Sequence, residues 1–99
     1  MTIKFLEPAQ KELDEAYIYY DSKEKGLGSI FMDEIYWALK NIKAYPMAWP
    51  DFSDRTRRCL LPTFPSSIIY RIRDNEILVI AIAIAQSHRE PDYWNTRLK

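Results

Sequence analysis

The feature that most constrains the fold is a run of nine apolar residues, "ILVIAIAIA", at positions 77–85. Both alternating sets of positions in the run are apolar, which is typical of a strand covered on both faces. The run is far too short to span a bilayer as a helix, which needs about 20 apolar residues. We therefore expect a central strand over 76–85, with a helix over one face and a C-terminal segment near the other.

Two amphipathic helices are predicted before this strand. Pro8 suits the first turn of a helix over 8–23, and Gly26 is interpreted as its C-terminal stop. A second helix is expected over 28–45, ended by Pro46. Because the link between them is short, the two helices should form an antiparallel hairpin. Their apolar faces are predicted to consist of Ala9, Leu13, Ala16, Tyr17 and Tyr20 in the first helix, and Phe31, Ile35, Ala38, Leu39, Ile42 and Tyr45 in the second.

The remaining segments are predicted to be mainly strands, at 2–7, 55–61 and 67–73. Asp74–Asn75 is a suitable two-residue turn into the central strand. Pro91 would begin a last short helix over 91–98. The expected fold class is α+β in the order β-α-α-β-β-β-α, with a helical hairpin packed on a small, mostly antiparallel sheet. Residues 1–99 have the size of a single domain.

The composition limits the kinds of metal site and disulfide that the chain can form. One cysteine and one histidine exclude the usual zinc quartets, so we expect neither a metal nor a cofactor. A single cysteine makes no internal disulfide, which favours a reducing cytosol and a cytoplasmic location. The first ten residues lack the apolar segment of a signal peptide, and no membrane partner is expected.

The arginines are distributed unevenly along the chain. All seven lie in the second half, and no lysine occurs between Lys43 and Lys99. Arginine offers a planar fork for phosphates and carboxylates, whereas lysine is a hydrated point charge. The distribution indicates either a salt-bridged strand surface or a site for an acidic partner, peptide or nucleic acid. The seven are Arg55, Arg57, Arg58, Arg71, Arg73, Arg89 and Arg97.

The C-terminal stretch "QSHREPDYWNTRLK", residues 86–99, contains polar anchors and aromatic residues. His88 has the one side chain whose ordinary pKa is near neutrality, so it is the default acid–base candidate. A lone histidine in a loop is more often simply exposed. Tyr93 and Trp94 could stack on a nucleobase, or they could attach the last helix to the body of the protein.

Five segments, taken in order, resemble the RelE/ParE superfamily of toxins from type II toxin–antitoxin modules, in particular its ParE-like "plasmid stabilization" branch. The similarity extends over essentially the whole chain. Two positions depart from the family pattern, because Gln86 stands where a histidine is usual and Ser66 where an aromatic is common. The segments are "AQKELDEAYIYY" (9–20), "LGSIFMDEI" (27–35), "YPMAWP" (45–50), the strand pair "RRCLLPTFPSSIIYRI" (57–72) and the ending "HREPDYWNTR" (88–97).

The resemblance implies one of two activities. RelE-like members cut messenger RNA in the ribosomal A site, using lysines, arginines and a C-terminal tyrosine. Tyr93 matches that tyrosine by position, but residues 44–98 contain no lysine. ParE-like members inhibit DNA gyrase by binding and need no catalytic set. We therefore expect a ParE-like, non-enzymatic toxin that is neutralised by a cognate antitoxin. The alternatives are a ribosome-dependent mRNA endonuclease and a degenerate member that only binds its antitoxin.

The candidate site residues follow from these alternatives. For an enzyme, the catalytic candidates would be Arg58, Arg71, His88, Arg89 and Tyr93. For a binding protein, the residues expected to contact the target or the antitoxin are Arg57, Arg58, Arg71, Arg73, Arg89, Trp94 and Arg97.

Overall fold

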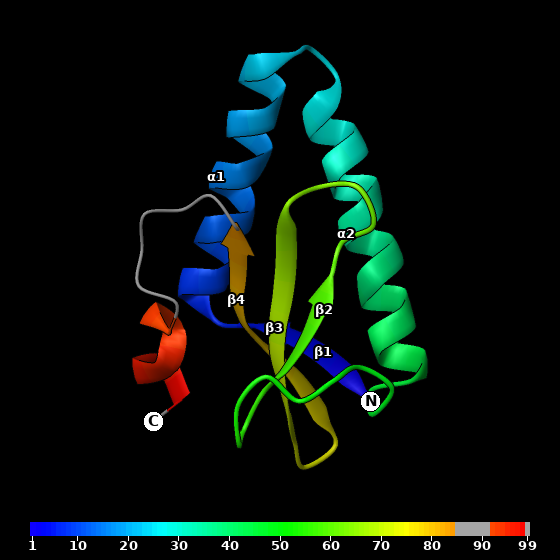
Figure 1. The fold of residues 1–99 in the computed structure, drawn as a ribbon, viewed down its shortest axis with the longest axis vertical. Helices are drawn as coiled ribbons and strands as arrows, with labels where there is room; N and C mark the ends of the chain where they lie inside the picture. The colour runs from blue at the N-terminus through cyan, green and yellow to red at the C-terminus, as the bar shows by residue number, and fades with distance from the viewer. Residues whose placement is uncertain (85–91, 99) are drawn as a thin grey trace.

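The structure is a computed structural model that describes residues 1–84 and 92–98 (Figure 1). Two helices form a hairpin, four strands form one sheet, and a short 3-10 helix follows near the C-terminus. The elements in chain order are β1 (Thr2–Phe5), α1 (Glu7–Lys23), α2 (Leu27–Ala44), β2 (Arg57–Leu60), β3 (Ser66–Arg73), β4 (Glu76–Ile84) and η1 (Tyr93–Leu98).

The strands are ordered β1-β4-β3-β2 in the sheet. β4 pairs in parallel with β1 and antiparallel with β3, and β3 pairs antiparallel with β2. The α+β class, the mostly antiparallel sheet and the inner position of the apolar strand are therefore confirmed. The predicted turn at Asp74–Asn75 is also confirmed, and Asp74 adopts a positive φ of 56° there.

The helical hairpin packs closely near its tip, where α1 and α2 run side by side (Figure 1). Ala9, Leu13, Ala16 and Tyr20 form the buried face of α1, as predicted, but Tyr17, predicted on the same face, is 38% exposed. A Cβ atom on Gly28 would lie 2.8 Å from the backbone oxygen of Tyr17, so only glycine permits this approach of the two helices.

Asp21 stabilises the turn between the helices. Its Oδ1 accepts hydrogen bonds from the backbone nitrogens of Gly26 at 2.9 Å and Gly28 at 3.2 Å. These groups lie at the N-terminus of α2, where backbone N–H groups lack helical partners. The prediction that Gly26 ends the first helix was wrong. Gly26 is the N-cap of α2, with a φ of 93°, whereas α1 ends at Lys23 with Glu24 as its C-cap.

A β-bulge in β4 determines which of its side chains face each side of the sheet. Ile69 pairs with Ala81 and Tyr70 with Val79, so Ile80 is an extra residue without a direct partner. A bulge shifts the alternation of side chains. As a result Ile77, Val79 and Ile82 pack on the helical side, and Ile80 and Ala81 pack on the opposite side.

Several predicted boundaries differ from the observed ones. The strand expected to reach residue 7 ends at Phe5, because α1 begins at Glu7. The strand expected over 55–61 covers only Arg57–Leu60, and Tyr45, predicted on the apolar face of α2, is 66% exposed. The last helix, expected over 91–98, is a 3-10 helix over Tyr93–Leu98, and residue 91 lies outside the described residues. The tighter 3-10 geometry is common in short terminal turns.

Candidate functional site

The sheet face opposite the helical hairpin, called the outer face below, carries three of the predicted site arginines, Arg58, Arg71 and Arg73. Residues alternate between the two faces along each strand. Ile69 of β3 belongs to the small core on the outer face, where it packs with Trp94 and Leu98 of η1. Arg71 and Arg73 follow at two-residue spacing and therefore lie on the same face as Ile69.

Arg58 reaches the outer face from β2, where it stands opposite Ile69. Its guanidinium carbon lies 4.4 Å from the centroid of the Phe52 ring. That ring in turn packs on Trp94, with centroids 5.7 Å apart and an interplanar angle of 34°. A cation over an aromatic ring is stabilised by the ring quadrupole. Arg58, Phe52 and Trp94 therefore link β2, the preceding loop and η1.

Arg71 and Arg73 extend this surface along β3. Arg71 is half-buried and its Nη1 donates to the carbonyl oxygen of Leu98 at 3.4 Å. Arg73 is exposed, and so is Lys4 of β1. Lys4 and Arg73 line a hollow of about 550 Å³, together with Thr2, Leu6, Asp74, Asn75, Glu76 and Leu78. We call Lys4, Arg58, Arg71 and Arg73 the basic outer face.

Two other predicted binding arginines are engaged within the fold. Arg57 donates from Nη1 to the carbonyl oxygens of Trp49 at 2.5 Å and Met47 at 3.3 Å, and its Nη2 lies 3.4 Å from Asp51 Oδ1. Arg97 forms a two-pronged ion pair with Glu12, with distances of 2.9 and 3.1 Å. These contacts hold a loop and η1 in place.

Trp94 is an internal anchor. Only 3% of its surface is exposed, and it packs with Ile69, Ile80, Ala81 and Leu98. Its indole N–H has no hydrogen-bond partner among the described residues. Trp94 therefore contributes to the stability of the fold through packing. The proposal that this aromatic residue attaches the C-terminal helix to the body agrees with its position.

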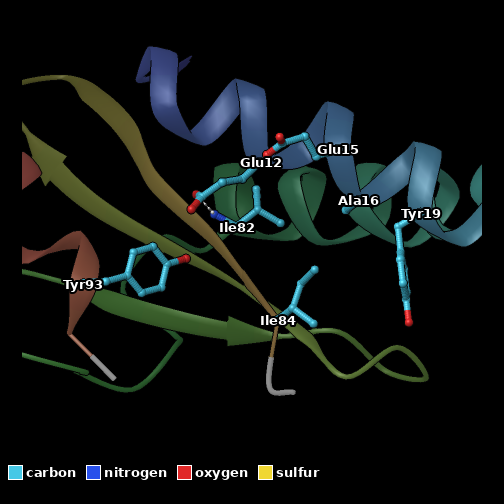
Figure 2. Close-up of a pocket in the computed structure, with 7 residues that line it drawn as sticks. All are labelled: Glu12, Glu15, Ala16, Tyr19, Ile82, Ile84 and Tyr93. Carbon is cyan, nitrogen blue, oxygen red and sulfur yellow. Dashed lines mark hydrogen bonds between the residues drawn. The ribbon is translucent and has the colours of Figure 1, made fainter. Parts of the chain in front are cut away.

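Tyr93 lies beside carboxylates (Figure 2). It lines a pocket of about 250 Å³ with Glu12, Glu15, Ala16 and Tyr19 of α1 and with Ile82 and Ile84 of β4. The guanidinium of Arg97 lies 5.1 Å from the centre of its ring. Neither Arg58 nor Arg71 lines this pocket.

The buried titratable groups stay protonated at neutral pH. Burial raises the pKa of the Cys59 thiol to about 11, so it is a poor nucleophile. Burial likewise raises the pKa of Tyr70 to about 12, although nearby Arg57 opposes the shift. The Tyr70 hydroxyl donates to the carbonyl oxygen of Pro46 at 2.7 Å. Burial, with a smaller contribution from Tyr19, also raises the pKa of Tyr20. These groups are structural.

Two catalytic candidates, His88 and Arg89, lie outside the described residues. Within residues 1–84 and 92–98, no cluster of three or more His, Cys, Asp or Glu side chains is arranged to hold a metal ion. In the same part of the chain, none of the helices combines the length and apolar character that crossing a membrane requires.

Sequence reasoning missed two positions of the candidate site. Phe52 was assigned no role, yet its ring contacts both Arg58 and Trp94. Lys4 was assigned only to the predicted strand over 2–7. It pairs with Leu78 of β4, which in turn pairs with Arg71, so Lys4 lies in the same row of the sheet as that arginine. The alternation of Lys4 with Ile3 and Phe5 was the signal available for Lys4. None was available for Phe52.

Comparison with known proteins identifies the fold. No family model matches the chain, and no curated protein matches it. Among solved structures, the chain is similar to one from the chromosomal ParDE toxin–antitoxin system of P. aeruginosa, with a TM-score of 0.69 and 19% sequence identity. The match covers 87% of this chain and 97% of that one. The protein therefore has a ParE-like fold, as the sequence resemblance implied.

Proposed function

We propose that this protein is the toxin of a type II toxin–antitoxin module, that it acts by binding a host target, and that a cognate antitoxin neutralises it. The observation that carries the proposal is the similarity in fold to a chain of a ParDE toxin–antitoxin system over 87% of the protein. The family segments found in the sequence support the same assignment.

The antitoxin contact is proposed on the basic outer face. Arg71, Arg73 and Lys4 present positive charge there, and Arg58 adds a guanidinium stacked on Phe52. Complementary charge steers association and fixes the register of the partner. An antitoxin segment with several Asp or Glu residues would match this surface. Trp94, Arg57 and Arg97 would support the interface from within the fold, since their contacts are internal.

A binding mechanism fits the site better than RNA cleavage does. Metal-independent cleavage needs cations around the scissile phosphate and a group that activates the 2′-hydroxyl. Tyr93, the candidate that matches the ribonuclease branch by position, shares its pocket with Glu12 and Glu15. Glu12 is paired with Arg97, so the exposed Glu15 is the residue that would present like charge to a phosphate entering that pocket. We therefore propose DNA gyrase, the target of the ParE-like branch, as the host target.

Charge reversal on the basic outer face tests the antitoxin contact. The double variant Arg71→Glu/Arg73→Glu should bind the product of the neighbouring antitoxin reading frame at least about tenfold more weakly at low salt. Its affinity should also depend less on salt, because fewer attractive charges remain to be screened. Titration calorimetry at two salt concentrations measures both effects.

The control is Lys40→Glu/Lys43→Glu, which makes the same charge change at exposed positions of α2. Because Arg71 also contacts Leu98, a second variant, Lys4→Glu/Arg73→Glu, removes charge at two exposed positions without touching that bond. Equal affinity of all variants at low salt would contradict docking on this face.

A further inference from the structure

β4 has an open edge over part of its length. β1 pairs with β4 only from Glu76 to Val79, and the backbone of Leu6 makes the last hydrogen bond, to the oxygen of Val79. From Ile80 to Ile84, the described residues supply β4 with one neighbouring strand, β3. Such an edge presents backbone donors and acceptors that can pair with another chain.

Two side chains occupy the position of the missing strand. The Oε1 atom of Glu12 accepts a hydrogen bond from the backbone nitrogen of Ile82 at 3.1 Å, shown as a dashed line in Figure 2. The Nη1 atom of Arg97 donates to the carbonyl oxygen of Ile80 at 3.1 Å. A neighbouring strand would offer the same two groups, one acceptor and one donor, along this edge.

Glu12 and Arg97 also hold each other in place. Their two hydrogen bonds are 2.9 and 3.1 Å long, and the side chains are only 11% and 16% exposed. Glu12 comes from α1 and Arg97 from η1. The pair therefore connects the first helix, the sheet edge and the C-terminal 3-10 helix at one point.

We propose that Glu12 and Arg97 form an edge cap, in which a carboxylate and a guanidinium substitute for a neighbouring strand and prevent β4 from pairing with another chain. In the cap, the carboxylate must lie at Ile82 N–H, which needs an acceptor, and the guanidinium at Ile80 C=O, which needs a donor. An ordinary ion pair between α1 and η1 has no such requirement.

This difference defines the test. In the swapped variant Glu12→Arg/Arg97→Glu the two charges can still pair, but Ile82 N–H now faces a donor and Ile80 C=O an acceptor. We expect the amide of Ile82 to exchange with solvent at least about tenfold faster than in the wild type. The amide of Ile77, which lies where β4 has strands on both sides, should keep its rate.

A second variant keeps the test possible if the swapped variant does not fold. Glu12→Leu/Arg97→Leu removes both charges, so neither is left buried alone, and it also removes the cap. Faster exchange at Ile82 is expected here as well. Light scattering during gel filtration measures the molar mass. The molar mass of both variants should increase with protein concentration more than that of the wild type does.

The control is Glu15→Arg, a charge reversal on an exposed residue of α1 in the same pocket. Its exchange at Ile82 and its mass should match the wild type. Wild-type exchange at Ile82 in the swapped variant would mean that any ion pair suffices, and it would overturn the edge cap. Unchanged exchange at Ile82 in the Leu/Leu variant would overturn it too.

Discussion

Replacing Ile82 with aspartate is expected to leave no folded protein. Ile82 is 2% exposed and packs in the core between the sheet and the helical hairpin. Burying an unpaired carboxylate there costs several kcal/mol. That cost is comparable with the whole stability of a protein of this size, roughly 5–15 kcal/mol. Far-UV circular dichroism and a thermal melt measure the result.

Ile80→Asp should have the same effect from the opposite face, since Ile80 is 1% exposed and packs with Trp94 and Leu98. Leu60→Asp is the control, because Leu60 is also in a strand but is 60% exposed. It should change the Tm by only a few degrees. A soluble Ile82→Asp protein with the wild-type Tm would contradict the placement of β4 inside the fold.

Replacing Trp94 with alanine is expected to lower the Tm by more than about 10 °C. The substitution removes the largest side chain of the outer-face core and the ring on which Phe52 packs. Large aromatic-to-alanine changes in a core cost about 3–5 kcal/mol, and each kcal/mol corresponds to about 4–8 °C in a protein of this length. η1 should detach, so the amides of 93–98 should lose protection before the sheet does.

Tyr93→Phe is the matched control for this variant. It alters the neighbouring residue of η1, retains the ring that lies beside Arg97, and should shift the Tm by less than about 3 °C. If Trp94→Ala has the same Tm as the wild type, the packing of η1 on the outer face contributes little to stability, and the internal role assigned to Trp94 is wrong.

The sequence was most informative for the central strand, because a strand buried on both faces has a simple apolar pattern. The run at 77–85 is apolar at both alternating sets of positions, which predicted a strand covered by helices on one side and a C-terminal segment on the other. The structure has this arrangement, with the hairpin on Ile77 and Ile82 and η1 on Ile80. The bulge at Ile80 could not be predicted, because a uniformly apolar run does not reveal where its alternation shifts.

The arginines were harder to interpret because their position in the sequence says little about their partners. Arg57 and Arg58 are adjacent, and alternation sends one to loop carbonyls and the other to Phe52. Arg97 was predicted as a binding residue, and its internal partner Glu12 lies 85 residues away in the sequence. Contacts over such separations depend on the folded topology, which local patterns do not encode. The binding and catalytic assignments themselves stay predictions.

The proposed function requires that the protein acts by binding rather than by cutting RNA. The direct test is to induce the chain in a bacterial host and to measure, in the same cultures, the supercoiling of a reporter plasmid and the integrity of translated messenger RNA. We expect growth arrest with loss of gyrase supercoiling and intact mRNA, unchanged by Tyr93→Phe and relieved by the antitoxin. Codon-phased mRNA cleavage that disappears with Tyr93→Phe would contradict the account and favour the ribonuclease alternative.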